Sequence, residues 1–180
     1  MKLNVPYKNV GSVPLSLVEE SLALIKPEHW LVDETRNKMG NLEHTQSIIL
    51  RYFDNYNSSI LPDWKNRIVN KKLQPIYQQI IDKFLFELKK YYKFNEYMVF
   101  FAKLLPYCNV GLHVDSGEFL ETCNRIHIPL QTNKDVFYVI ENNDYNWILG
   151  NIYEFDNTRI HGVKNNSDKD RIHLMFNLYE

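Results

Sequence analysis

The sequence predicts a mainly β protein with some α-helix, in which a helix-rich first half supports a C-terminal β-sandwich or barrel. Between residues 74 and 92, apolar side chains recur every three or four positions, as on the buried face of a helix. From Tyr97 onward, short runs rich in β-branched and aromatic residues alternate with polar or glycine-containing turns, at the spacing of a sandwich or barrel. We expect one domain over residues 1–180, with residues 1–96 as support and residues 97–180 as the core that carries the site.

The first half is expected to contain two helices and at least one strand. In chain order we expect an extended lead-in over residues 1–11, a helix over Leu15–Ile25, a polar loop over Asp33–Gly40, a strand over His44–Phe53, a polar connection over Asp54–Pro62 and a helix over Gln74–Tyr92. Ser12 is positioned to cap the first helix, and Pro14 lies in its first turn. Arg36, in the polar loop, is a candidate clamp for a substrate carboxylate, because loops rim such sites.

The second half is expected to be all strands. The predicted strands are Met98–Leu105, Asn109–Asp115, Arg125–Leu130, Val136–Ile140, Trp147–Leu149, Asn151–Phe155 and Ile172–Leu178. A β core follows from this pattern.

Composition narrows the function classes. The formal net charge is −1 and no long Lys/Arg run occurs, so a general nucleic-acid-binding surface is not expected. The two cysteines, Cys108 and Cys123, form no CxxC pair, which argues against a zinc knuckle or a disulfide framework. No apolar run approaches a signal peptide or a membrane span, so we expect a cytoplasmic protein without membrane contact. No heptad repeat indicates an oligomer, so monomer and homodimer both remain open.

The strongest chemical motif is His113-Val114-Asp115, followed 48 positions after its histidine by His161. On a strand, side chains two residues apart point to the same face, about 7 Å apart along the backbone. Two ligands from one strand and a distant histidine make the 2-His-1-carboxylate set that holds non-haem Fe(II) with coordination positions open. We therefore predict His113, Asp115 and His161 as metal ligands and catalytic centre.

Two further strands place charged residues opposite an apolar face. In Arg125-Ile126-His127-Ile128 and in Arg171-Ile172-His173-Leu174, arginine and histidine alternate with aliphatic residues. One interpretation is a pair of half-exposed strands with solvated polar faces. If that face lines the interior of a sandwich, each arginine needs an anion, because a buried unpaired charge is very costly. Guanidinium groups match carboxylates, so two inward arginines beside a metal triad indicate a ligand with two carboxylates, such as 2-oxoglutarate.

These motifs, taken in order, carry a family resemblance. The segments are Arg125–Leu130, Trp147, Gly150, Phe155–Asn157, His161–Val163, Asn165 and Arg171–Leu174. Together they resemble the aspartyl/asparaginyl β-hydroxylase family, over roughly residues 98–178. The resemblance implies a double-stranded β-helix (jelly-roll, cupin-like) core and a hydroxylase that uses Fe(II), 2-oxoglutarate and O2.

Carried over by position, the resemblance also implies roles for individual residues. His113, Asp115 and His161 would hold the iron, and Arg171 would bind the far carboxylate of 2-oxoglutarate. Arg125 and His127 would lie near its metal-proximal end or near the substrate. The substrate would be an amino acid, free or within a peptide or other small molecule, and the co-products succinate and CO2.

Two other functions are compatible with the same residues. A non-catalytic β-sandwich sensor could bind a metal or a 2-oxoglutarate-like dicarboxylate, and absence of turnover would identify it. An iron-dependent halogenase needs the carboxylate position free for halide, and Asp115 argues against it. The near-neutral charge argues against a nucleic-acid demethylase, which needs a basic track.

Overall fold

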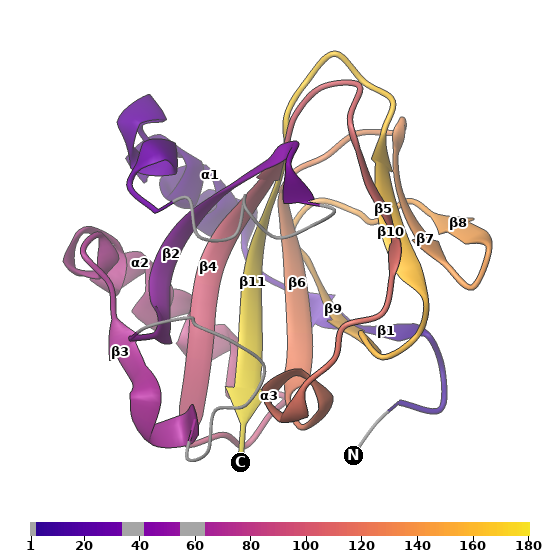
Figure 1. Ribbon diagram of the computed structural model, residues 1–180. Helices are drawn as coiled ribbons and strands as arrows, with labels where there is room; N and C mark the ends of the chain where they lie inside the picture. Colours follow the sequence, from indigo (N-terminus) through magenta and orange to yellow (C-terminus); the bar gives the residue numbers. More distant parts are fainter. Residues whose placement is uncertain (1–2, 34–41, 55–63) are drawn as a thin grey trace.

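The computed structural model describes residues 3–33, 42–54 and 64–180, whose strands form two antiparallel sheets of seven and four strands (Figure 1). The larger sheet contains, in spatial order, β1 (Tyr7–Ser12), β9 (Asn151–Phe155), β6 (Asn124–Gln131), β11 (Arg171–Tyr179), β4 (Glu96–Leu104), β2 (Thr45–Phe53) and β3 (Ile68–Asn70). The smaller sheet contains β5 (Asn109–His113), β10 (His161–Asn165), β7 (Val136–Ile140) and β8 (Asn143–Tyr145). Short helical elements complete the described chain: α1 (Leu15–Leu24), α2 (Gln74–Leu88), α3 (Glu118–Glu121) and 3₁₀ turns at Pro27–Leu31 and Trp64–Arg67.

Helices α1 and α2 cover the face of the larger sheet that points away from the smaller one (Figure 1). The apolar stripe of α2, including Tyr77, Ile81 and Phe84, is fully buried, as its periodicity predicts. This stripe packs on the outward side chains of the central strands, such as Ile128 and Leu174. Helices α1 and α2 thus pack on the sheet, while the same half of the chain also contributes β1, β2 and β3 to it.

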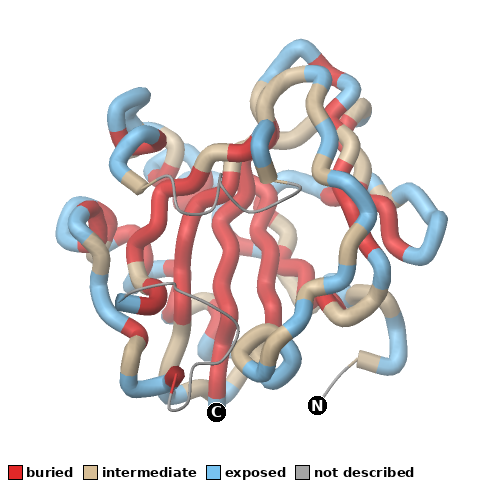
Figure 2. Tube along the Cα trace, viewed as in Figure 1, coloured by how far each residue is buried: buried red, intermediate tan, exposed pale blue. Residues whose placement is uncertain are grey.

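The opposite face of the larger sheet looks into the interior. Along β6 and β11 the aliphatic residues join the helix-covered core, whereas Arg125, His127, Arg171 and His173 point the other way. These four are 7%, 3%, 5% and 1% exposed, so the alternative of two solvated polar faces is wrong. Figure 2 shows the central strands as an almost continuous buried slab. The polar residues are sealed between two sheets, where they must find partners.

Several element predictions need correction. Ser12 is not a helix cap but the last residue of β1, and Pro14 stands at the cap position of α1 without a side-chain hydrogen bond. Trp147–Leu149 is not a strand, because the chain turns back at Gly150, whose φ of 74° favours glycine. Helix α2 ends at Leu88 rather than Tyr92.

Strands β3, β8 and β10 were not predicted. Among the described residues, no helix is long and apolar enough to cross a membrane. The loop that carries Arg36 lies outside the described residues.

Candidate metal and carboxylate site

Two neighbouring strands of the smaller sheet bring the predicted histidines together. His113 ends β5 and His161 begins β10, and their Cα atoms are direct partners in the antiparallel register. Their ring centroids are 4.3 Å apart. Each of His113, Asp115 and His161 offers a ligand atom within 4.8 Å of the other two. Residues 48 positions apart in the chain thus form one donor set.

Backbone carbonyls orient both imidazoles. Nδ1 of His113 lies 2.8 Å from the Gly111 carbonyl oxygen, and Nδ1 of His161 lies 2.8 Å from that of Arg159. A carbonyl oxygen can only accept, so each Nδ1 must carry the hydrogen. Each Nε2 then keeps its lone pair, which is the tautomer that binds a metal.

Asp115 follows the end of β5 and is held from several sides. Its backbone N–H donates to the Asn157 carbonyl over 3.0 Å, and the Asn157 side-chain amide donates to Oδ2 over 3.3 Å. Nε of Arg125 lies 3.6 Å from the same oxygen. Burial by itself raises the pKa of Asp115, but Arg125 and the hydrogen bond with His113 outweigh it and hold the pKa well below the usual range. The carboxylate is therefore ionised and ready for a cation.

The two histidines differ in their readiness to bind protons. Burial lowers the pKa of His161 to about 4, against the opposing effect of Asp115. The hydrogen bond with Asp115 raises the pKa of His113 above its ordinary value, and partial burial opposes that rise. At neutral pH His161 is a neutral ligand. Of the two histidines, His113 is the one for whose imidazole nitrogen protons compete more strongly with a metal ion.

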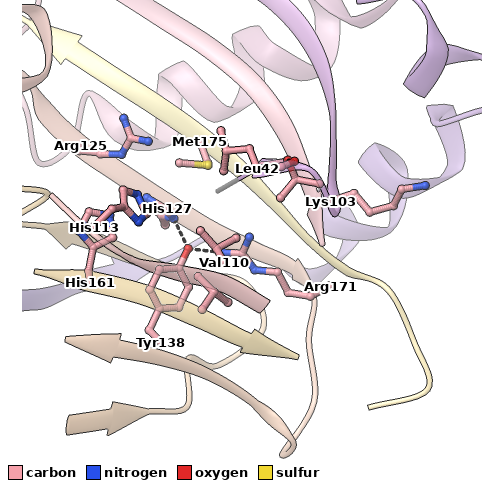
Figure 3. Close-up of a pocket in the computed structure, with 13 residues that line it drawn as sticks. Leu42, Lys103, Val110, His113, Arg125, His127, Tyr138, His161, Arg171 and Met175 are labelled. Atoms are coloured by element: carbon pink, nitrogen blue, oxygen red, sulfur yellow. Dashed lines mark hydrogen bonds between the residues drawn. The ribbon is translucent and has the colours of Figure 1, made fainter. Parts of the chain in front are cut away.

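Arg171 lies farther along the same pocket, which both sheets line (Figure 3). Its guanidinium is buried, and one nitrogen, Nη2, donates to the Tyr138 hydroxyl. Nε has no hydrogen-bond partner. Within the described part of the chain, no carboxylate lies at salt-bridge distance from Arg171. A buried cation needs a counter-ion, and the carboxylate of a ligand would supply one to Arg171.

Comparison with known proteins agrees with this geometry. The family model for aspartyl/asparaginyl β-hydroxylases matches residues 17–180. The chain belongs to the aspartyl/asparaginyl β-hydroxylase family. Members of this family are hydroxylases that depend on Fe(II) and 2-oxoglutarate, and the chain is accordingly assigned to this enzyme class, with O2 as the second co-substrate. Among curated proteins, no match was found.

Solved structures establish the same fold at low sequence identity. A prolyl-4-hydroxylase from Pseudomonas putida has a TM-score of 0.57 at 11% identity, covering 98% of this chain and 94% of its own. A 2-oxoglutarate–Fe(II) oxygenase family oxidoreductase from Burkholderia pseudomallei has a TM-score of 0.55 at 11% identity, with 92% and 89% coverage. The collagen prolyl hydroxylase of Paramecium bursaria Chlorella virus-1 gives 0.51 at 10% identity, with 98% of both chains covered. The double-stranded β-helix core expected from the sequence is confirmed.

The residues present fit the cofactors of the β-hydroxylase family. Two neutral imidazole nitrogens and one ionised carboxylate are the donor set of a facial triad that leaves positions open. At the other end of the pocket, the orphaned Nε of Arg171 provides a donor for an anionic oxygen. A metal ion and a dicarboxylate would therefore complete bonds that the protein leaves open.

The structure brings all six predicted site residues into one neighbourhood. His113, His161, Arg125, His127 and Arg171 line the same pocket, and Asp115 lies beside His113 and Arg125. His44, by contrast, pairs with Glu43 at the surface.

Sequence reasoning missed two contributors to the site. One is Asn157, which anchors Asp115, and the other is Tyr138, which bridges Arg171 and His127. The sequence contained a signal for Tyr138, because alternation along the predicted strand Val136–Ile140 places it on the same face as two aliphatic core residues. Asn157 lies in a turn, and only the folded chain shows its partner.

Proposed function

We propose that the protein hydroxylates an unactivated C–H bond of an amino acid, either free or as a residue of a peptide or other small molecule, and releases succinate and CO2. One observation carries the proposal: the two histidines of a His–Asp–His donor set line the same pocket as a buried arginine that has no carboxylate partner among the described residues. When bound, ferrous iron supplies the O2 activation that no side chain can perform. The protein supplies positions, charges and a dry environment.

In this proposal His113, Asp115 and His161 hold the iron, and together they are the catalytic residues. Asn157 keeps the Asp115 carboxylate directed at the metal position, and the two backbone carbonyls keep both imidazoles in the ligand tautomer. These contacts fix the donor set before the metal arrives.

Arg171 binds the distal carboxylate of 2-oxoglutarate. Arg125 and His127, which line the pocket beside His113 and His161, would lie near the keto-acid end of such a ligand. Arg125 donates to Asn177 and lies beside Asp115, so it neutralises the anionic groups gathered at this end. Arg125 and His127 serve either this metal-proximal end or the substrate.

The test is coupled turnover. Purified protein with Fe(II), 2-oxoglutarate and O2 is screened against free amino acids and short peptides, and succinate and hydroxylated product are quantified together. We expect one substrate class to give stoichiometric succinate and a product heavier by one oxygen. Binding of 2-oxoglutarate without succinate from any substrate would favour the sensor alternative and contradict the hydroxylase proposal.

A further inference from the structure

The Tyr138 hydroxyl occupies the centre of the pocket wall, between two of the proposed cofactor-binding residues. Nη2 of Arg171 donates to it on one side, and Nδ1 of His127 lies 2.6 Å from it on the other (Figure 3). All three side chains are buried.

The direction of each hydrogen bond follows from elementary chemistry. A guanidinium has only donors, so the Tyr138 oxygen must accept from Arg171. Among the described residues, Nδ1 of His127 is the only acceptor within hydrogen-bond reach of the Tyr138 hydroxyl. Because a buried hydroxyl hydrogen needs an acceptor, it points to Nδ1, which accepts with its lone pair. A neutral imidazole carries its hydrogen on the other nitrogen, so His127 is the Nε2–H tautomer. Its Nε2 is buried and has no hydrogen-bond partner, like Nε of Arg171.

We propose that Tyr138 is a positioning residue, which fixes His127 as a hydrogen-bond donor toward the pocket and anchors Arg171 in the same act. The nitrogens left without a partner, Nε2 of His127 and Nε of Arg171, then both carry a hydrogen, and the pocket selects a ligand that offers acceptors at both places. The identity of that ligand as 2-oxoglutarate rests on the proposed function. The tautomer of His127 is a property of the protein alone.

The surroundings of Tyr138 hold its hydroxyl in place. The ring stacks on Trp147 with centroids 3.7 Å apart and planes 17° apart, and Trp147 stacks in turn on Tyr153 at 4.6 Å and 8°. The Arg171 guanidinium lies over the Tyr138 ring, 5.0 Å from its centroid. Tyr138 also lies on β7, which is paired on both sides, by β10 and by β8. A hydroxyl on so rigid a support keeps a fixed direction, as a positioning group must.

A donor-only wall has a consequence for ligand choice. A doubly ionised dicarboxylate presents acceptor oxygens to every donor, whereas an amide at the distal end would place its own N–H groups against Arg171. When two buried donors face each other, both lose their hydrogen bonds, and this lowers the binding free energy of the ligand. We expect wild-type protein to bind 2-oxoglutarate more tightly than 2-oxoglutaramate, its distal amide.

The decisive variant is Tyr138→Phe, which removes the hydroxyl and keeps the stacked ring. Tyr153→Phe is the matched control, because Tyr153 is equally buried and belongs to the same aromatic stack. The Tyr153 hydroxyl accepts hydrogen bonds from the Ile148 backbone and the Asn151 side chain, and among the described residues it is not hydrogen-bonded to a proposed cofactor-binding residue. Any effect specific to Tyr138→Phe therefore comes from the bridge and not from a disturbed core.

The first measurement is long-range ¹⁵N–¹H NMR of the imidazoles in metal-free protein. We expect His127 as the Nε2–H tautomer in the wild type and in Tyr153→Phe, and a mixture of tautomers in Tyr138→Phe. An Nδ1–H tautomer in the wild type would overturn the inference, and so would an unchanged tautomer in Tyr138→Phe. The wild-type spectrum decides even if Tyr138→Phe does not fold.

The second measurement is the dissociation constant of 2-oxoglutarate with Mn(II) in place of iron. Tyr138→Phe should weaken 2-oxoglutarate about tenfold, the equivalent of one hydrogen bond, and leave Mn(II) affinity unchanged. Tyr138→Phe should also reduce the ratio between the dissociation constants of 2-oxoglutaramate and 2-oxoglutarate. Equal 2-oxoglutarate affinity in Tyr138→Phe and Tyr153→Phe would contradict the positioning role. If the wild type binds no 2-oxoglutarate, the proposed function fails, and the tautomer measurement still judges Tyr138.

Discussion

Replacing Arg171 by methionine should stabilise the protein without ligands and abolish its response to 2-oxoglutarate. The arginine is 5% exposed and has no carboxylate partner in the described chain. The ligand-free fold therefore contains a buried positive charge that only a bound anion would neutralise. Such a residue stabilises a complex at the expense of the free protein. Methionine has a similar length, adapts to irregular gaps and needs no partner.

The expected change in the free energy of unfolding follows from one destabilising and two stabilising contributions of Arg171. Burying an unpaired ion costs several kcal/mol. The charge-assisted hydrogen bond to Tyr138 returns about 1.5–3 kcal/mol, and the guanidinium over the Tyr138 ring, 5.0 Å from its centroid, returns about 2 kcal/mol. We expect the free energy of unfolding of ligand-free Arg171→Met to exceed that of wild type by about 1–3 kcal/mol. Each kcal/mol corresponds to about 2–4 °C in Tm for a chain of this length.

The assay is thermal unfolding with Mn(II), with and without 2-oxoglutarate. A ligand at 100 times its Kd should stabilise the wild type by about 2.7 kcal/mol and Arg171→Met not at all. Arg51→Met is the control, because Arg51 in the same sheet is paired with Glu96 at 2.7 Å, and its loss should lower the Tm. An Arg171→Met protein that is less stable than wild type yet still stabilised by 2-oxoglutarate would refute the reasoning.

Three further predictions concern the metal end. Asn157→Ala should weaken Mn(II) binding about 10–100-fold, because Asp115 loses the amide that orients it; isothermal titration would measure this, and unchanged affinity would remove Asn157 from the site. Metal affinity should fall as the pH decreases through the raised pKa of His113, since protons compete with the metal for its Nε2. Asp115→Asn should move the midpoint of this pH dependence to lower pH, because the carboxylate that raises the pKa of His113 is lost. A pH-independent metal affinity would contradict this. Gly162→Ala should reduce both metal affinity and Tm, because a Cβ there would lie 2.7 Å from the Val110 carbonyl and force β5 from β10; a silent substitution would show that this strand pair tolerates separation.

Strands β6 and β11 could be predicted because apolar and polar residues alternate along them. Along β6 and β11 every second residue is aliphatic or, at Phe176, aromatic, and this face of each strand meets the helices. For Arg125 and Arg171 the alternation left two possibilities, a solvated face or the interior of a sandwich, and the structure buries both side chains. The donor set was predictable for a related reason, since His113 and Asp115 share a short local motif.

The elements that were missed depend on partners far away in the chain. The segment His161–Asn165 contains Gly162 and Lys164 and has little strand propensity, and it becomes β10 because β5 and β7 pair with it on both sides. The sequence predicted a strand at Trp147 because this residue is aromatic and is followed by the aliphatic residues Ile148 and Leu149. Its indole instead stacks between Tyr138 and Tyr153, and the chain turns at the following glycine. The alternation of Val136–Ile140 indicates that Tyr138 is buried, but its bridge to His127 and Arg171 joins three strands and shows only in the folded chain.

The central claim is that one pocket binds iron through the His–Asp–His set and 2-oxoglutarate through Arg171. Anaerobic addition of Fe(II) and 2-oxoglutarate should produce the weak visible charge-transfer band of the metal–keto-acid chelate. The same titration on His161→Ala should give no band because the metal is lost, and on Arg171→Ala the band should require far more 2-oxoglutarate, with Fe(II) binding retained. A wild-type protein that forms no band, or a band that survives unchanged in both variants, would contradict the account.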